Sequence, residues 1–127
     1  MVAGLQLRKP DKPIPTPSEV SEWADRPYRS LVGSLIYLAI ATRPDIVYAA
    51  RNLSSFLDRY RLEHWDAAVR VLRYLKGTRL FTLTLGGKNS LQLSAYSDSD
   101  YANCVDTSRS ISGYCFTLGS GMISWCS

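Results

Sequence analysis

The sequence predicts an α+β fold in which three helices precede an antiparallel sheet. Apolar residues recur with a helical period of about 3.6 up to Gly77, and they alternate with polar residues after it. Glycine-rich stretches at residues 86–87 and 119–121 separate the alternating runs, as turns separate strands. Of the 127 residues, 46% are hydrophobic and 20% are charged, which is typical of a globular domain.

The same composition excludes several protein classes. The longest uninterrupted apolar run, residues 35–41, is far shorter than the roughly 18 residues of a membrane span. The N-terminus shows no secretory signal. The three cysteines (Cys104, Cys115 and Cys126) are an odd number without metal-type clustering, which favours free thiols. We therefore expect an intracellular protein of the cytoplasm or nucleus, with no membrane partner.

The first part of the chain is expected to contain an extended segment and three helices. Residues 1–27 form a Pro-rich extended lead-in, with a short helix possible over residues 18–24. A helix over residues 29–41 is apolar nearly all round and is expected to be buried. In the next helix, over residues 44–57, Thr42 and Asp45 have the spacing of a capping box.

The third helix is expected over residues 63–76, with Gly77 as the C′ residue that ends it. Its apolar stripe consists of Trp65, Ala68, Val69, Leu72 and Leu75. The strands are then expected over residues 79–85, 91–98, 110–118 and 122–126.

Basic residues are concentrated in the first part of the chain. Residues 1–79 hold 13 of the 15 Lys and Arg residues and 8 of the 11 Asp and Glu residues. Five of these cations are candidates for a surface that follows nucleic-acid phosphates: Arg43, Arg70, Arg73, Lys76 and Arg79. The alternative is a solvated helix face whose charge suits the C-terminal end of the helix dipole.

Histidine and aromatic residues have structural alternatives as well. His64 has no nucleophile near it in the sequence, so we expect it to pack or hydrogen-bond at a helix start rather than to act as a base. Trp65, Tyr74 and Trp125 are candidates for stacking on bases, but packing in the core is the expected role.

Seven stretches of the sequence occur together, in this order, in one known family. They are residues 28–38 (YRSLVGSLIYL), 42–46 (TRPDI), 64–68 (HWDAA), 70–78 (RVLRYLKGT), 96–102 (YSDSDYA), 110–114 (SISGY) and 123–125 (ISW). Over about residues 27–127 the chain thus resembles the Pol polyprotein of copia-type LTR retrotransposons.

The resemblance implies two domain segments. Residues 28–88 resemble the thumb/connection end of a reverse transcriptase, and residues 89–127 resemble the first three strands of an RNase H-like domain, so the fold would be a truncated RNase H-like one. In the family, Asp98 matches the first carboxylate of the RNase H site, which binds Mg²⁺ for hydrolysis of the RNA–DNA hybrid. The polymerase aspartates would lie upstream of residue 1, and the other RNase H carboxylates beyond Ser127.

Asp98 alone therefore makes an incomplete catalytic and metal site, because two-metal hydrolysis needs several carboxylates around ions about 4 Å apart. Asp100 would share its face if the strand continues; the alternative is that both face water. We expect no tightly bound metal and no catalysis by this fragment.

The resemblance implies RNA–DNA hybrid and the remainder of the polyprotein as partners. The rival interpretation is a non-catalytic nucleic-acid-binding or protein-interaction module retained by its host. Without a covering helix, the sheet would expose Phe116, Ile123 and Trp125 and favour self-association.

Overall fold

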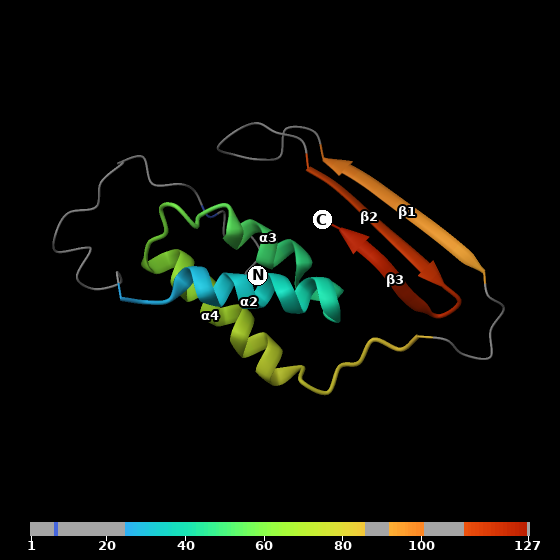
Figure 1. Ribbon diagram of the computed structural model, residues 1–127, viewed down its shortest axis with the longest axis horizontal. Helices are drawn as coiled ribbons and strands as arrows, with labels where there is room; N and C mark the ends of the chain where they lie inside the picture. The colour runs from blue at the N-terminus through green and yellow to red at the C-terminus, as the bar shows by residue number, and fades with distance from the viewer. Residues whose placement is uncertain (1–6, 8–24, 86–91, 101–110, 127) are drawn as a thin grey trace.

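The computed structural model describes residues 7, 25–85, 92–100 and 111–126, and it places a group of helices beside a small sheet (Figure 1). Its elements are α2 (Tyr28–Ala41), the 3₁₀ helix η1 (Pro44–Ile46), α3 (Val47–Ser54), α4 (Leu62–Gly77), β1 (Leu93–Asp100), β2 (Ile111–Leu118) and β3 (Gly121–Cys126). The expected order, with the helices first and an antiparallel sheet second, is confirmed. Most of the lead-in over residues 1–27, the helix expected at 18–24 and the turn at 86–87 lie outside the described residues.

The core lies where α2 packs against α3 and α4. Tyr28 is 1% exposed; its hydroxyl donates to the Leu53 carbonyl at 2.9 Å, and its ring stacks on Tyr60 with the centroids 4.4 Å apart. Burial raises the pKa of Tyr28 to about 12, and the neighbouring Tyr60 adds to the rise. The other buried apolar residues are Leu7, Val32, Leu35, Ala39, Ile46, Ala50, Leu53, Phe56, Ala68 and Val71.

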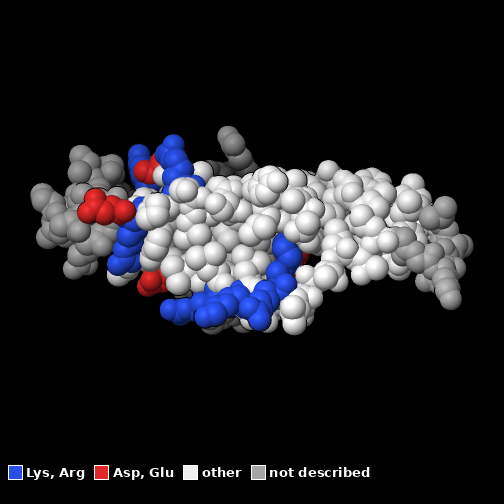
Figure 2. All heavy atoms as spheres, turned by 60° about the horizontal axis from the view of Figure 1, so that its bottom comes forward, with Lys and Arg blue, Asp and Glu red and all other residues white. Residues whose placement is uncertain are grey.

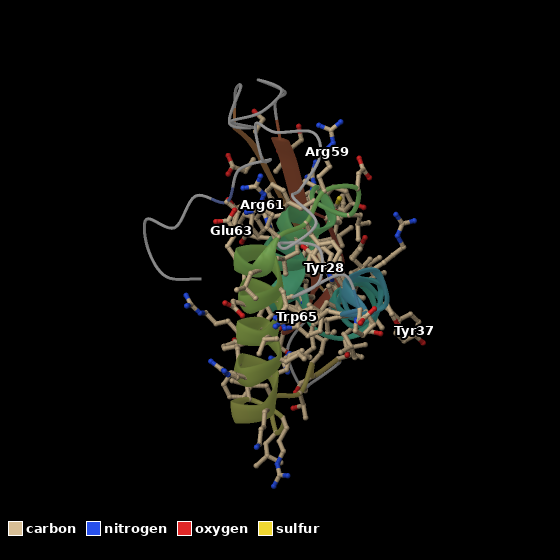
Figure 3. The ribbon with its side chains drawn as sticks, turned by 90° about the vertical axis from the view of Figure 1, so that its left-hand side faces the viewer. Tyr28, Tyr37, Arg59, Arg61, Glu63 and Trp65 are labelled. Atoms are coloured by element: carbon tan, nitrogen blue, oxygen red, sulfur yellow. The ribbon has the colours of Figure 1, made fainter. Side chains whose placement is uncertain are left out.

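The expectation that the first helix is buried all round is wrong. Tyr37 and Ile40 are 74% and 70% exposed, and Tyr37 lies on the side of α2 remote from α4 (Figure 3). The reason is that α2 packs on α3, η1 and α4 with one face, and none of the described helices covers the opposite face. Apolar composition alone therefore overstated how much of this helix is covered.

The helix expected over residues 44–57 is shorter and begins differently. It starts as the 3₁₀ helix η1 and ends at Ser54, because the amide of Phe56 bonds to the Leu53 carbonyl at 3.2 Å in a turn that closes the helix. The capping box expected from Thr42 and Asp45 is also wrong. Arg43 precedes η1 without any side-chain cap, and the Asp45 carboxylate bonds to Arg43 instead.

At the start of α4, His64 is fully buried and accepts a hydrogen bond from the Arg61 amide through Nδ1 at 3.0 Å. The expected structural role of His64 at a helix start is thus confirmed. The buried line of α4 is His64, Ala68 and Val71, whereas Leu72, expected in the apolar stripe, is 41% exposed. Gly77 is the last residue of the helix rather than the residue after it.

The sheet has the order β1-β2-β3 and is antiparallel throughout. The expected hairpin at residues 119–121 is confirmed, and Gly119 adopts the positive φ of 62° that its turn requires. The prediction of a strand over residues 79–85 is wrong. The chain turns through residues 78–80 and then runs without regular structure, and its backbone at Thr84 approaches β3 at Gly121.

The sheet contacts the helices through β3. The indole Nε1 of Trp125 donates to the Ala39 carbonyl of α2 at 2.8 Å, so the expectation that this side chain is exposed is wrong. Phe116 and Ile123 are 37% and 47% exposed, as expected for a sheet that the described helices leave largely uncovered. None of the described helices is long and apolar enough to span a membrane.

Candidate nucleic-acid interface

The C-terminal half of α4 carries a row of cations, Arg70, Arg73 and Lys76, which we call the α4 basic face. At 3.6 residues per turn these positions fall within about a third of the helix circumference, and all three side chains are exposed. Figure 2 shows a band of Lys and Arg side chains along the lower edge of the helical part, and the described surface to its right is almost uncharged. Within the described residues, none of the three makes an ion pair or a side-chain hydrogen bond.

The charge of α4 changes sign along its length. Glu63 and Asp66 lie in the first two turns, whereas the basic face occupies the last two. The cations there complement the negative end of the helix dipole, so their position alone does not require a ligand. Arg79 is exposed just beyond Gly77 and extends the row of cations past the helix end.

Arg43, the fifth cation expected on this surface, is held by internal contacts instead. Its Nε and Nη2 donate to the two carboxylate oxygens of Asp45 at 2.9 and 2.7 Å. Nη2 also donates to the Thr78 hydroxyl at 2.7 Å, which joins the start of η1 to the end of α4. Since the Arg43 side chain is only 11% exposed, it does not lie with the α4 basic face.

Tyr74 completes this cluster. Its hydroxyl donates to Asp45 Oδ2 at 2.9 Å, and the hydrogen bonds from Arg43 and then Tyr74 lower the pKa of Asp45. The hydrogen bond to Asp45 raises the pKa of Tyr74. The Arg43 guanidinium carbon lies 5.7 Å from the centre of the Tyr74 ring and 6.0 Å from that of Phe81.

The sequence did not single out Phe81, because its alternating neighbourhood predicted a strand. Of the aromatics that it did single out, Trp65 is half-buried with Arg26 over its ring at 5.5 Å, and Trp125 packs on α2. Tyr74 is 43% exposed beside the basic face. The Arg-Pro-Asp stretch at residues 43–45 was the available signal for the cluster, since an Arg two residues from an Asp can form a bidentate pair.

Asp98 lies far from these cations in the architecture. It is exposed on β1, opposite Gly113 of β2, and the side chain of Asp100 is outside the described part of the chain. The described residues contain no group of three or more His, Cys, Asp or Glu side chains able to hold a metal ion. Asp98 with its described neighbours therefore does not fit a Mg²⁺ site, and the expected role of Asp98 stays a prediction. The described cysteines, Cys115 and Cys126, are free thiols.

Comparison with known proteins finds relatives among transposon sequences. The chain is 43% identical over 121 residues to the retrovirus-related Pol polyprotein from transposon TNT 1-94 of Nicotiana tabacum, covering 95% of this chain and 9% of the relative. It is 49% identical over 100 residues to the retrovirus-related Pol polyprotein from transposon RE1 of Arabidopsis thaliana, covering 79% and 7%.

Another relative is shorter. The secreted RxLR effector protein 161 of Plasmopara viticola is 44% identical over 99 residues, covering 78% of this chain and 70% of that protein. The chain thus spans less than a tenth of the two transposon polyproteins but most of this short protein. No family model matches the chain, and no solved structure matches it.

Proposed function

We propose that the chain is a segment of a transposon Pol polyprotein, of the copia type, that joins two of its domains, because it is 43–49% identical to retrovirus-related Pol polyproteins from transposons. Residues 28–88 would form the thumb/connection end of a reverse transcriptase, and residues 89–127 the N-terminal part of an RNase H-like domain. The helices-then-sheet order supports this division. Synthesis of DNA on RNA and hydrolysis of the hybrid would then be activities of the whole polyprotein.

Within that polyprotein, the proposed role of this segment is to hold the RNA–DNA hybrid by its phosphates. The observation that carries this role is the α4 basic face, where three exposed cations have no acidic partner among the described residues. Guanidinium and ammonium groups that are free of internal pairs bind phosphate without first breaking a protein contact. The remainder of the polyprotein would supply the carboxylates that Asp98 needs to bind Mg²⁺.

The test measures hybrid binding by fluorescence anisotropy across a range of salt concentrations. In the test variant, glutamine replaces Arg70, Arg73 and Lys76; in the matched control it replaces Arg29, Arg51 and Arg59, which are exposed outside α4. If the basic face binds phosphates, the salt slope of log Kobs falls by about 2–3 in the test variant, and much less in the control. Equal affinities and salt slopes for the two variants would refute phosphate binding by the α4 basic face. They would support the alternative, in which this face is only solvated.

A second function is supported by the relative from Plasmopara viticola, since the chain covers 70% of that short protein. A segment of this kind would then also exist apart from a full polyprotein, as a non-catalytic module that binds nucleic acid or protein. Translating the genomic sequence on both sides separates the two functions. A continuous reading frame that contains the missing carboxylate motifs supports the polyprotein segment, whereas a promoter and a stop codon close to this frame support the module.

A further inference from the structure

Phe81 is an exposed aromatic ring next to the cluster formed by Arg43 and Asp45. Its backbone amide donates to the Thr78 carbonyl at 3.0 Å, which closes a turn directly after α4. The Arg43 guanidinium lies against its ring, at 6.0 Å from the ring centre. The side chain is nevertheless 63% exposed, so the ring remains largely open to solvent.

The Arg43 side chain beside this ring makes several hydrogen bonds. Arg43 is clamped by both oxygens of Asp45 and by the Thr78 hydroxyl, at distances of 2.7–2.9 Å. Its guanidinium also lies against Tyr74, whose hydroxyl is held by Asp45. Because the Asp45 carboxylate neutralises Arg43, the cation serves mainly to hold the two rings.

These rings adjoin the α4 basic face. Tyr74 lies one helical turn after Arg70, and residues four apart share a line along a helix. Lys76 and Arg79 lie in the chain between Tyr74 and Phe81, and both are exposed. Cations that pair with phosphates are thus placed beside rings that offer an apolar surface.

We propose that Phe81 is a platform on which an unpaired base of a single-stranded nucleic acid stacks while its phosphates follow the α4 basic face. This proposal rests on the proposed function and specifies the form of nucleic acid that the site prefers. An exposed aromatic ring offers a stacking surface to any base, because every base has an aromatic face. Duplex bases already stack on one another, so a hybrid would contact only the cations.

The test compares two fluorescent probes of equal length, oligo(dT) and an RNA–DNA hybrid, in anisotropy titrations with the 127-residue chain. The variant is Phe81→Ala, and the control is Tyr37→Ala, which removes a ring that is 74% exposed on α2. We expect Phe81→Ala to weaken oligo(dT) binding roughly 5- to 100-fold and hybrid binding by less than about twofold. The salt slope should stay unchanged, because Phe81 contacts no phosphate.

A second variant, Phe81→Trp, retains a stacking surface and is expected to bind oligo(dT) at least as tightly as the parent. Circular dichroism spectra check that all variants keep their helices. If Phe81→Ala matches Tyr37→Ala on oligo(dT), or weakens both probes equally, the platform is refuted. A parent chain that binds neither probe, or that binds independently of the α4 cations, refutes the proposed function as well, so the two failures are distinguishable.

Discussion

Replacing Arg43 by alanine should loosen the junction between η1 and the end of α4. The bidentate pair with Asp45 contributes about 1 kcal/mol, because the Asp45 side chain is 33% exposed and water screens it. The bond to the Thr78 hydroxyl comes from a guanidinium that is 11% exposed, and it contributes about 1–1.5 kcal/mol more. We therefore expect Arg43→Ala to lower the free energy of unfolding by about 2–2.5 kcal/mol.

The assay is urea unfolding followed by the helical circular dichroism signal, on the parent, Arg43→Ala, Asp45→Ala and the double variant. The coupling energy between the two positions should be about 1 kcal/mol. Arg43→Lys is the matched control, because it keeps the charge but lacks the planar fork, and it should lose about half as much. A coupling energy near zero, or Arg43→Ala within about 0.5 kcal/mol of the parent, would show that the cluster stabilises nothing.

The same pair makes stability depend on pH on the acidic side. The hydrogen bond from Arg43 holds the folded-state pKa of Asp45 below its ordinary value. The contribution of Asp45 is therefore fully present above the unfolded pKa of about 4, and it is lost as pH falls through the lower folded value. In Arg43→Ala, stability should therefore fall less as the pH is lowered. Unfolding curves at a series of acidic pH values would measure this difference.

Three further predictions concern other parts of the chain. Gly121→Ala should cost about 1–3 kcal/mol of stability in urea unfolding, because its Cβ would collide with the backbone carbonyl of Thr84. The stability contribution of Tyr28 should be present below pH 10 and be lost as pH rises from 10 to about 12, and tyrosinate absorbance with and without Tyr28→Phe would show this. The purified chain should not cleave RNA in a hybrid with Mg²⁺ or Mn²⁺, and cleavage that disappears in Asp98→Asn would contradict this.

Local sequence signals predicted those elements that local interactions determine. The hairpin at residues 119–121 and the helices near 29–41 and 63–76 follow from turn residues and apolar periodicity, and the structure contains them. The prediction of a strand over residues 79–85 was wrong for a physical reason. Alternation of apolar and polar residues shows that one face of the segment is apolar, but it does not show whether a partner strand is available. Here Arg43 holds Thr78 and Phe81 from more than 30 residues away, and that contact has no local signature.

The candidate interface was predictable only in part, for the same reason. Charge and helical spacing identified Arg70, Arg73 and Lys76, which are exposed together on α4. The same reasoning grouped Arg43 with them, since a sequence shows the charge of a residue but not its partners. Arg43 was expected to bind phosphate, but it pairs with Asp45 and lies against the rings of Tyr74 and Phe81.

The arrangement of the sheet separates the α4 basic face from Asp98. Trp125 joins β3 to α2, and β2 lies between β3 and β1, so Asp98 is on the strand farthest from the helices (Figure 1). No described contact links Asp98 to the α4 basic face, and effects at such separate sites add independently. A loss of affinity after substitution of the α4 basic face therefore measures nucleic-acid binding alone. An effect of Asp98→Asn on hydrolysis, measured in the full-length polyprotein, would instead measure the catalytic step.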